Sequence, residues 1–483
     1  MSKYRTTPAP STEMPKGIPY IVGNEAAERF SFYGMKAILY VFMTEHLLGL
    51  DGARDVMTKE QATFWVAIFV ASAYFFPVLG AIVSDVLWGK YRTIIVLSLV
   101  YCLGHLALAL DETRIGLAAG LTLIAVGAGG IKPCVSAHVG DQFGPQNQDL
   151  ISKVFRWFYF SINLGAFASQ LLTPLLLKWY GPGAAFGIPG VLMFLATVVF
   201  WLGRHEFIHV PPAGIGAVQR AFSGERLRAM LNLARLYVFV AVFWSLFDQS
   251  ASRWVEQAKH MDRRWEIVGW FPASWDAAAW LPEGWHSFEW LASQLQFVNP
   301  ALIMILIPVF SFVIYPGLNW LFPLTPLRKI SIGLFVMVPA FALSAWIQGQ
   351  IDAGREPDVA WQILAYVILT SSEVMVSITC LEFSYTQAPR EVKSFIMSLY
   401  LLSVSAGNLL TAGVNLFIQN PDGTSKLPGD DYYWFFTAAM FLTAAAFIPA
   451  AMTYHGRTYI QGGDEKTAQA PVPGKSSPAL FEE

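Results

Sequence analysis

Two carboxylates and a guanidinium stand close together near the start of the chain, inside a stretch that is otherwise apolar. Glu25, Glu28 and Arg29 lie three to four positions apart, so in a helix they share one face. A charge at membrane depth is costly, and such residues usually serve ion or substrate pathways. Because two acids compete for one cation, one carboxyl can take up a proton. The alternative is a structural ion pair at a helix end.

Charged residues recur in apolar stretches far along the chain. The cations are Arg29, Lys36, Lys132 and Arg253, and the anions are Glu25, Glu28, Asp248, Glu373 and Glu382. Each would cost about 2.5–3.5 kcal/mol on insertion scales if it had no partner. The pattern therefore predicts a polar cavity between helices, closed by interhelical ion pairs, in which the surplus acid can be protonated. Static structural bridges are the alternative.

Lys132 is the most isolated of these cations. It follows three glycines in Gly127–Pro133, a segment without another charge. Glycines allow a second helix or a ligand to come close, and lysine is a compact cation whose protonation responds to its surroundings. The position indicates a binding site for an anionic group or for a distant acid. The alternative is that the side chain extends to the membrane surface.

The composition is that of a membrane protein. The 483 residues are 55% hydrophobic and only 14% charged, with a mean hydropathy of +0.46, whereas soluble domains carry about 25% charged residues. Windows of about twenty apolar residues mark membrane helices. Twelve are expected, at 18–48, 62–86, 93–110, 115–139, 154–177, 187–203, 234–257, 297–321, 330–349, 360–383, 394–418 and 432–454. The sequence thus predicts an all-α membrane protein with twelve transmembrane helices.

The placement of Lys and Arg predicts the orientation. With both termini in the cytoplasm, 19 of these residues fall in cytoplasmic segments and 9 on the opposite side, in agreement with the positive-inside rule. The expected organisation is an N-terminal cytoplasmic segment (1–17), a six-helix bundle (18–203), a cytoplasmic linker (204–235), a second six-helix bundle (236–454) and a cytoplasmic tail (455–483). The second bundle contains an extracytoplasmic loop (259–296), in which tryptophans favour short interfacial helices, and the end of the linker (225–235) is expected to lie on the membrane surface.

The sequence lacks the motifs of common catalytic sites. It contains no Gly-rich phosphate loop, no HExxH and no nucleophile elbow. Its cysteines, Cys102, Cys134 and Cys380, lie in apolar stretches without the spacing of metal ligands. We therefore expect neither an enzyme nor a bound metal or cofactor, and no nucleic-acid partner.

Several motifs together resemble those of one transporter family. Glu25–Gly34 reads Glu-x-x-Glu-Arg-Phe-x-x-Tyr-Gly, Phe158–Gly165 reads Phe-Tyr-x-x-Ile-Asn-x-Gly, and Leu381–Pro389 follows Glu373 in the tenth span. These segments resemble the proton-dependent oligopeptide transporters, a branch of the major facilitator superfamily, which implies the major facilitator fold. The chain departs from the family where Phe32 replaces a common tyrosine and where Ala67 stands in place of the histidine of animal members.

The resemblance implies roles for individual residues. The implied substrate-binding residues are Arg29, Tyr33, Tyr74, Lys132, Asn163, Trp244, Asn299 and Glu373. Proton coupling is implied for Glu25, Glu28, Arg29 and Glu373, and gating for Lys36, Asp248, Asp85 and Glu382. Lys36 and Asp248 are expected to pair, and Lys132 is expected to hold a substrate carboxylate or to pair with the acid of span ten. Asn163 and Asn299 are implied to contact peptide amides, although an Asn beside a Pro can also cap a helix.

The implied function is proton-coupled symport of di- and tripeptides by alternating access. A related alternative is a non-peptide substrate such as nitrate, because plant relatives share the first-helix motif. Glu373 argues against nitrate, since an acid opposite a basic pocket suits a zwitterion. The expected partners are peptides, protons and the lipid bilayer. The expected setting is a monomer in a bacterial inner membrane.

Overall fold

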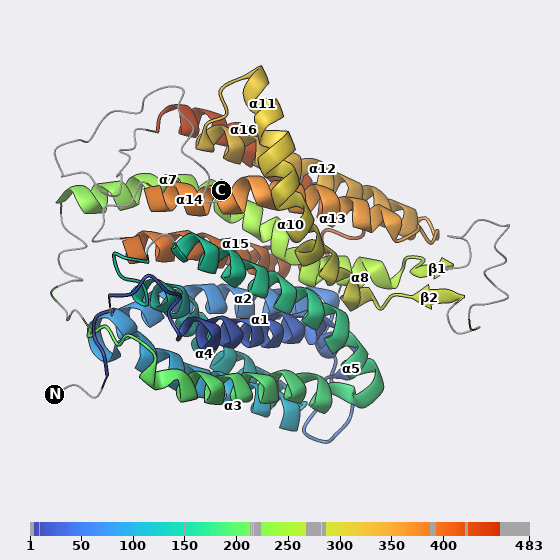
Figure 1. The fold of residues 1–483 in the computed structure, drawn as a ribbon. Helices are drawn as coiled ribbons and strands as arrows, with labels where there is room; N and C mark the ends of the chain where they lie inside the picture. Colours follow the sequence, from blue (N-terminus) through green and yellow to red (C-terminus); the bar gives the residue numbers. More distant parts are fainter. Residues whose placement is uncertain are drawn as a thin grey trace.

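The computed structural model describes residues 4–8, 10–147, 150–212, 214, 216, 224–266, 282, 286–386, 393–420 and 424–454. The predicted tail 455–483 and parts of the linker and of the loop 259–296 lie outside these residues. The described chain is almost entirely helical, and its long helices run side by side across the molecule (Figure 1).

The first half of the chain forms five long helices. They are α1 (Ile18–Val41), α2 (Lys59–Ile82), α3 (Lys90–Leu110), α4 (Arg114–Asp141) and α5 (Leu150–Leu202), with π-helical turns at Phe42–His46 and Val83–Trp88. The helix α1 packs along α5, and α4 packs along α3 and α2. The 53-residue α5 bends at Gly181, which has a φ of 77°. That conformation favours glycine and divides α5 into two membrane-spanning lengths.

The second half contains nine α-helices among the described residues, and several of them are short. They are α7 (Gly224–Phe247), α8 (Arg253–Lys259), α10 (Val298–Val309), α11 (Tyr315–Leu321), α12 (Pro326–Asp352), α13 (Ala360–Glu373), α14 (Thr379–Thr386), α15 (Lys393–Ile418) and α16 (Asp431–Met452). 3₁₀-helical turns lie at Gly203–His205, Asp248–Ala251 and Ala292–Phe297, and π-helical turns at Phe310–Ile314 and Val374–Ile378. The helix α12 packs on α13 and α16, and α7 packs on α15.

The helices agree with the predicted spans. In the described part of the chain, ten helical segments are long and apolar enough to cross a membrane. One of them, Lys153–His205, contains two predicted spans, and the charged α1 is not among the ten. With these two, the arrangement is consistent with twelve spans in an all-α, multi-pass membrane protein.

Spans five and six were expected to be separated by residues 178–186. The break falls inside this range, at Gly181, and helix continues on both sides of it. A second boundary prediction was wrong. Residues 225–235 were expected to form a helix on the membrane surface, but they are the first turns of α7, which runs on to Phe247. No Gly or Pro interrupts 225–247, so nothing in the sequence stops the helix there.

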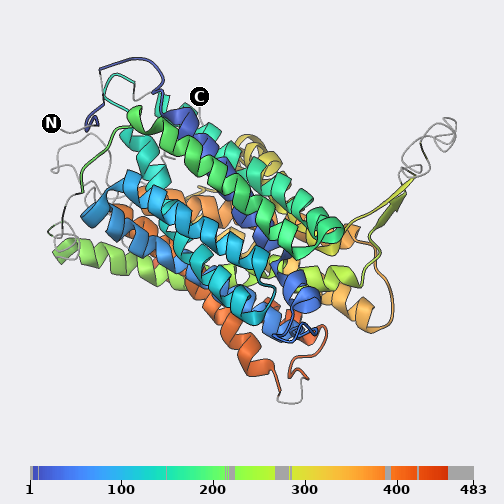
Figure 2. The same cartoon turned by 90° about the horizontal axis from the view of Figure 1, so that it is seen from below.

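The described ends of the loop 259–296 contain a β-ribbon and one short 3₁₀ helix at Ala292–Phe297. The central part of the loop, where further short interfacial helices were expected, lies outside the described residues. Strand β1 (Arg264–Glu266) pairs antiparallel with β2 (Ser287–Glu289), with Trp265 opposite Phe288. The two strands project beyond the helices (Figure 2). Polar and aromatic residues alternate in both segments, which is the period of a strand, and cross-strand aromatic pairs stabilise it.

The two ends of the molecule differ, because only one of them carries the β-ribbon. The ribbon side carries β1 and β2 together with the end of α1 and the start of α2, and the terminal side is the opposite end (Figure 1). The halves meet where α2 packs against α15. Within the first half, α4 approaches its neighbours closely through glycines. A Cβ added at Gly127 would lie 2.7 Å from the backbone nitrogen of Tyr101 in α3.

We predict that Gly127→Ala destabilises the protein. The new methyl group would meet backbone atoms of α3 that cannot move aside, and such overpacking costs about 1–3 kcal/mol. The measurement is the thermal unfolding midpoint of the purified protein. Gly140→Ala is the matched control in the same helix, because its Cβ would meet nothing within 4 Å. Equal midpoints for the two variants would contradict the close packing of α3 and α4.

Candidate functional site

The first-helix triad is assembled as its spacing predicts. Nε and Nη2 of Arg29 both lie 2.7 Å from Oε1 of Glu25, and Nε lies 3.3 Å from Oε2 of Glu28. Both acids are almost fully buried. The two carboxylates therefore share one guanidinium.

Glu28 is held less firmly than Glu25. Its carboxylate accepts no hydrogen bond from the described residues, although Arg29 is close. The hydroxyl of Tyr101 in α3 donates to its main-chain oxygen at 3.5 Å. A buried carboxylate with so little hydrogen bonding is costly in its charged form.

Lys132 carries a buried ammonium group without a hydrogen-bond partner among the described residues. Its Nζ lies 4.0 Å from the ring centre of Phe32 and 4.3 Å from that of Tyr74. These cation–π contacts offset part of the cost of burial and leave the N–H groups unused. The expected pairing with the acid of span ten is absent here. Lys132 is thus free to bind an anionic group.

The acid of span ten has a different partner. Asn299 donates from Nδ2 to Oε2 of Glu373 at 2.7 Å and to Oγ1 of Thr370 at 3.1 Å. Asn299 therefore orients Glu373 and does not cap a helix. Tyr33 lies within electrostatic reach of both Arg29 and Glu373. Arg29 of the first half and Glu373 of the second half thus both lie near Tyr33.

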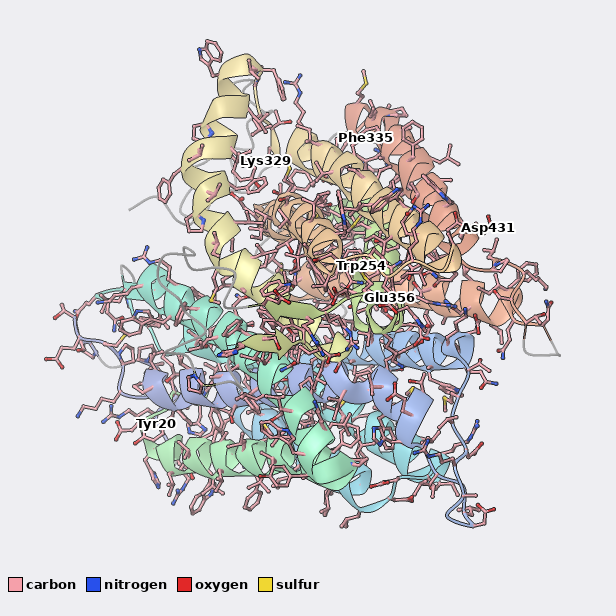
Figure 3. The ribbon with its side chains drawn as sticks, turned by 90° about the vertical axis from the view of Figure 1, so that its right-hand side faces the viewer. Tyr20, Trp254, Lys329, Phe335, Glu356 and Asp431 are labelled. Atoms are coloured by element: carbon pink, nitrogen blue, oxygen red, sulfur yellow. The ribbon has the colours of Figure 1, made fainter. Side chains whose placement is uncertain are left out.

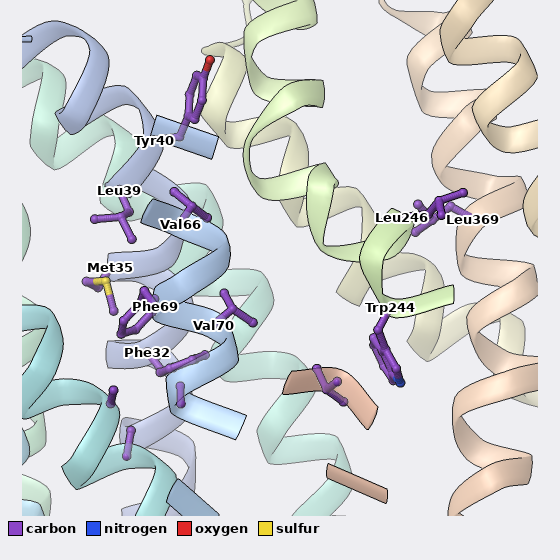
Figure 4. Close-up of a cluster of buried hydrophobic side chains, with 14 of the residues drawn as sticks. Phe32, Met35, Leu39, Tyr40, Val66, Phe69, Val70, Trp244, Leu246 and Leu369 are labelled. Carbon is purple, nitrogen blue, oxygen red and sulfur yellow. The ribbon is translucent and has the colours of Figure 1, made fainter. Parts of the chain in front are cut away.

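The remaining residues predicted to contact the substrate differ in how many of their polar groups already have hydrogen-bond partners. Nδ2 of Asn163 donates to the carbonyl of Tyr159 in its own helix at 2.9 Å, which leaves its side-chain oxygen as the available group. Trp244 projects from α7, and its Nε1 has no partner among the described residues. Figure 4 shows Phe32 in the cluster between α1 and α2, and Trp244 on the facing helix. The contact of Trp244 and Tyr74 with a substrate stays a prediction.

The predicted ion pair between Lys36 and Asp248 is present. Nζ of Lys36 lies 2.5 Å from Oδ1 of Asp248, and both side chains are about nine-tenths buried. Nδ2 of Asn408 donates to the other carboxylate oxygen at 2.8 Å. The pair joins α1 of the first half to the 3₁₀ turn Asp248–Ala251, which follows α7 in the second half.

A second buried pair was missed because one partner was assigned to a loop. Nη2 of Arg253 lies 3.4 Å from Oε1 of Glu60, and it donates to Oδ1 of Asn415 at 2.7 Å. The second span was predicted to begin at residue 62, but α2 begins at Lys59. The signal was available in the sequence, since Thr58 and Gln61 form a capping box that marks the helix start.

Two residues predicted to act in gating have neighbours within their own half. After the turn that contains Asp85, Lys90 at the start of α3 pairs with Asp141 at the end of α4 at 2.7 Å. The carboxylate of Asp85 accepts a hydrogen bond from Ser84, because both lie in the π-helical end of α2. Glu382 in α14 lies within electrostatic reach of Lys329 in α12. Gating roles for Asp85 and Glu382 stay predictions.

The polar contacts that join the two halves are concentrated on the ribbon side. Besides the two buried pairs, Lys259 pairs with Glu45 at 2.6 Å, and Tyr40 donates to Glu256 at 3.3 Å. Gln296 also donates to the carbonyl of Ala37 at 3.0 Å. The halves are therefore held together at this end of the molecule.

The family model described as POT family (PTR2) matches residues 91–223, 215–275 and 278–435. The chain belongs to the POT family. Its similarity to solved POT family structures extends over nearly the whole chain. It is 36% identical to the POT family transporter PepTSo, with a TM-score of 0.79 over 92% of this chain and 99% of the other.

Curated relatives are peptide transporters of animals. The chain is 34% identical over 404 residues to "Peptide transporter family 1" of Drosophila melanogaster, covering 73% of this chain and 51% of that protein. It is 33% identical over 422 residues to "Solute carrier family 15 member 2" of Homo sapiens, covering 75% and 53%. The chain thus spans about half the length of the curated relatives it matches.

We predict that Lys36→Met separates the halves on the ribbon side. Removing one member of a buried pair costs about 3–5 kcal/mol, because the remaining charge is left without its partner. The measurement is the distance between spin labels at Leu50 and Glu356, in a background without the native cysteines. Lys178→Met is the control, since this exposed lysine lies near the bend of α5. An unchanged distance distribution for Lys36→Met would show that the pair does not hold the halves together.

Proposed function

We propose that this protein is a proton-coupled importer of di- and tripeptides that works by alternating access. The observation that carries the proposal is a pair of opposite poles in two halves of the fold. Lys132 and Arg29 supply positive charge from the first half, and Glu373 supplies negative charge from the second. Every unmodified short peptide has a carboxylate at one end and an ammonium group at the other.

The arrangement favours recognition of a peptide by its two ends. The unused N–H groups of Lys132 suit the carboxylate, and Glu373, oriented by Asn299, suits the ammonium group. The side-chain oxygen of Asn163 can accept a hydrogen bond from a peptide amide. The side chains of the bound peptide would lie against Tyr33, Tyr74 and Trp244, since flat aromatic surfaces can pack against side chains of different shapes. Nitrate has no ammonium group, so it would leave Glu373 without a cationic partner.

The coupling to protons is assigned to the first-helix triad together with Glu373. When a substrate carboxylate draws on Arg29, the two acids lose part of their shared cation. Glu28 is the acid with fewer hydrogen bonds, so we propose that it is the first to take up a proton. Neutralising it lowers the cost of moving the triad between conformations, so that proton and peptide are transported together.

The contacts on the ribbon side are proposed to form the gate that faces the outside. Lys36 and Asp248 would separate to admit substrate, and Asp85 and Glu382 would act on the terminal side. In this proposal both termini lie in the cytoplasm of a bacterial cell. The first bundle spans 18–203, and the cytoplasmic linker that follows it ends where α7 of the second bundle begins at Gly224. We propose that the monomer is sufficient, because both poles lie within one chain.

The function is tested in proteoliposomes that contain the purified protein. A labelled dipeptide should accumulate when the outside is acidic, and a protonophore should abolish the accumulation. Nitrate uptake should stay at the level of empty liposomes. Accumulation of nitrate without accumulation of dipeptide would overturn the proposal.

We predict that Glu373→Gln weakens dipeptide binding by about tenfold or more. A hydrogen bond to a charged group contributes about 1.5–3 kcal/mol, and about 1.4 kcal/mol corresponds to a factor of ten. N-acetylated dipeptides, which lack the ammonium group, should lose much less affinity relative to their binding to the unmodified protein. The measurement is equilibrium binding of both ligands. An equal proportional loss would show that Glu373 does not bind the amino terminus.

We predict that Glu28→Gln abolishes accumulation driven by a pH gradient but retains exchange of peptide for peptide. The amide mimics the protonated acid, so substrate-loaded reorientation continues while net proton release stops. The paired measurements are gradient-driven uptake and counterflow into liposomes preloaded with unlabelled peptide. Retained accumulation would remove Glu28 from the coupling mechanism. Loss of both activities would indicate a structural role.

A further inference from the structure

A separate pocket of about 260 Å³ lies on the ribbon side of the second half. It is lined by the first residue of α2, by α8, by the end of α12 and by the start of α16. Figure 3 views the molecule from this side, with Trp254 and Asp431 marking α8 and α16. None of the residues assigned to substrate binding above lines it. The pocket therefore needs its own explanation.

The residues that line the pocket include an incompletely satisfied cation. Arg253 is 5% exposed and its guanidinium lies 4.1 Å from the ring centre of Tyr432. Its Nη groups contact Glu60 and Asn415, but its Nε has no hydrogen-bond partner among the described residues. The exposed Lys59 adds a second positive charge to the lining. Such a pair suits a carboxylate.

Acceptors line another part of the same pocket. Gln257 is 1% exposed, and its Nε2 donates to Ser344 and Gln348. Its Oε1 accepts no hydrogen bond from the described residues. Asp352 has an exposed carboxylate that accepts from Gln348 at 2.9 Å and from the backbone of Asp430 at 3.1 Å. Both oxygens suit an ammonium group. A pocket that served only anions would not contain Asp352.

We propose that this pocket binds a small zwitterion that carries a carboxylate and an α-ammonium group. Arg253 and Lys59 bind its carboxylate, and Gln257 and Asp352 bind its ammonium group. The volume suits an amino acid or a dipeptide with small side chains. Because Lys59 belongs to the first half and the other three residues belong to the second, the ligand bridges the halves. Its binding therefore stabilises the state in which they are joined on the ribbon side.

The first test separates this pocket from the central site. Binding of L-alanyl-L-alanine is measured by saturation-transfer NMR on the full chain carrying both Lys132→Ala and Glu373→Gln. Binding should persist in this background and should weaken at least tenfold when Asp352→Asn is added. Asp51→Asn, in an exposed loop on the same side, should have no effect. L-alanine distinguishes an amino-acid ligand from a peptide, and N-acetyl-L-alanyl-L-alanine should not bind. Absence of residual binding, or residual binding unaffected by Asp352→Asn, would overturn the proposal.

The second test uses the unmodified protein, so it does not depend on the folding of that variant. L-alanyl-L-alanine should slow acylation of Lys59 by a membrane-impermeant reagent, as followed by mass spectrometry. The exposed Lys178 should react at an unchanged rate, and Asp352→Asn should remove the protection of Lys59. Protection that survives Asp352→Asn, or no protection at any concentration up to saturation of the central site, would refute the pocket. Neither result would bear on transport through the central site.

Discussion

The cost of holding a charge away from water is the constraint on which this structure depends. Most of the buried charges meet that cost with a partner, as Arg29 does with Glu25 and Lys36 does with Asp248. Lys132 does so only in part, through the rings of Phe32 and Tyr74. A cation with aromatic contacts and unused N–H groups is ready to exchange one environment for another. An anionic ligand can therefore bind there without first breaking an ion pair.

The same constraint explains why the halves are joined where they are. On the ribbon side, each buried charge of one half has its partner in the other, as in the pair of Arg253 and Glu60. Separating the halves there exposes both members to water together, so neither is left buried alone. Buried ion pairs contribute little net stability compared with apolar packing. They are therefore suited to an interface that must open and close, whereas an apolar interface of equal area would resist opening.

Much of the fold and part of the site could be predicted from the sequence. Apolar length predicted the spans, and helical spacing predicted that Glu25, Glu28 and Arg29 meet. The pairing of Lys36 with Asp248 followed from the depth of each residue in its span. The partner of Glu373 could not be predicted in this way, because Asn299 lies 74 positions away and its approach depends on how α10 crosses α13. Glu60 was missed because a three-residue error at a helix start, from 59 to 62, moved it from the membrane into a loop.

The π-helical turns lie at different places in the two halves, so the two halves should deform differently. In the first half they lie at the ends of α1 and α2, and the helices between them are closely packed through glycines. In the second half, Phe310–Ile314 and Val374–Ile378 interrupt two spans in the middle, the latter directly after Glu373. Such turns leave backbone hydrogen bonds imperfect and act as hinges. We therefore expect the half that carries Lys132 to rotate as a rigid body, while the half that carries Glu373 bends beside its own binding residue.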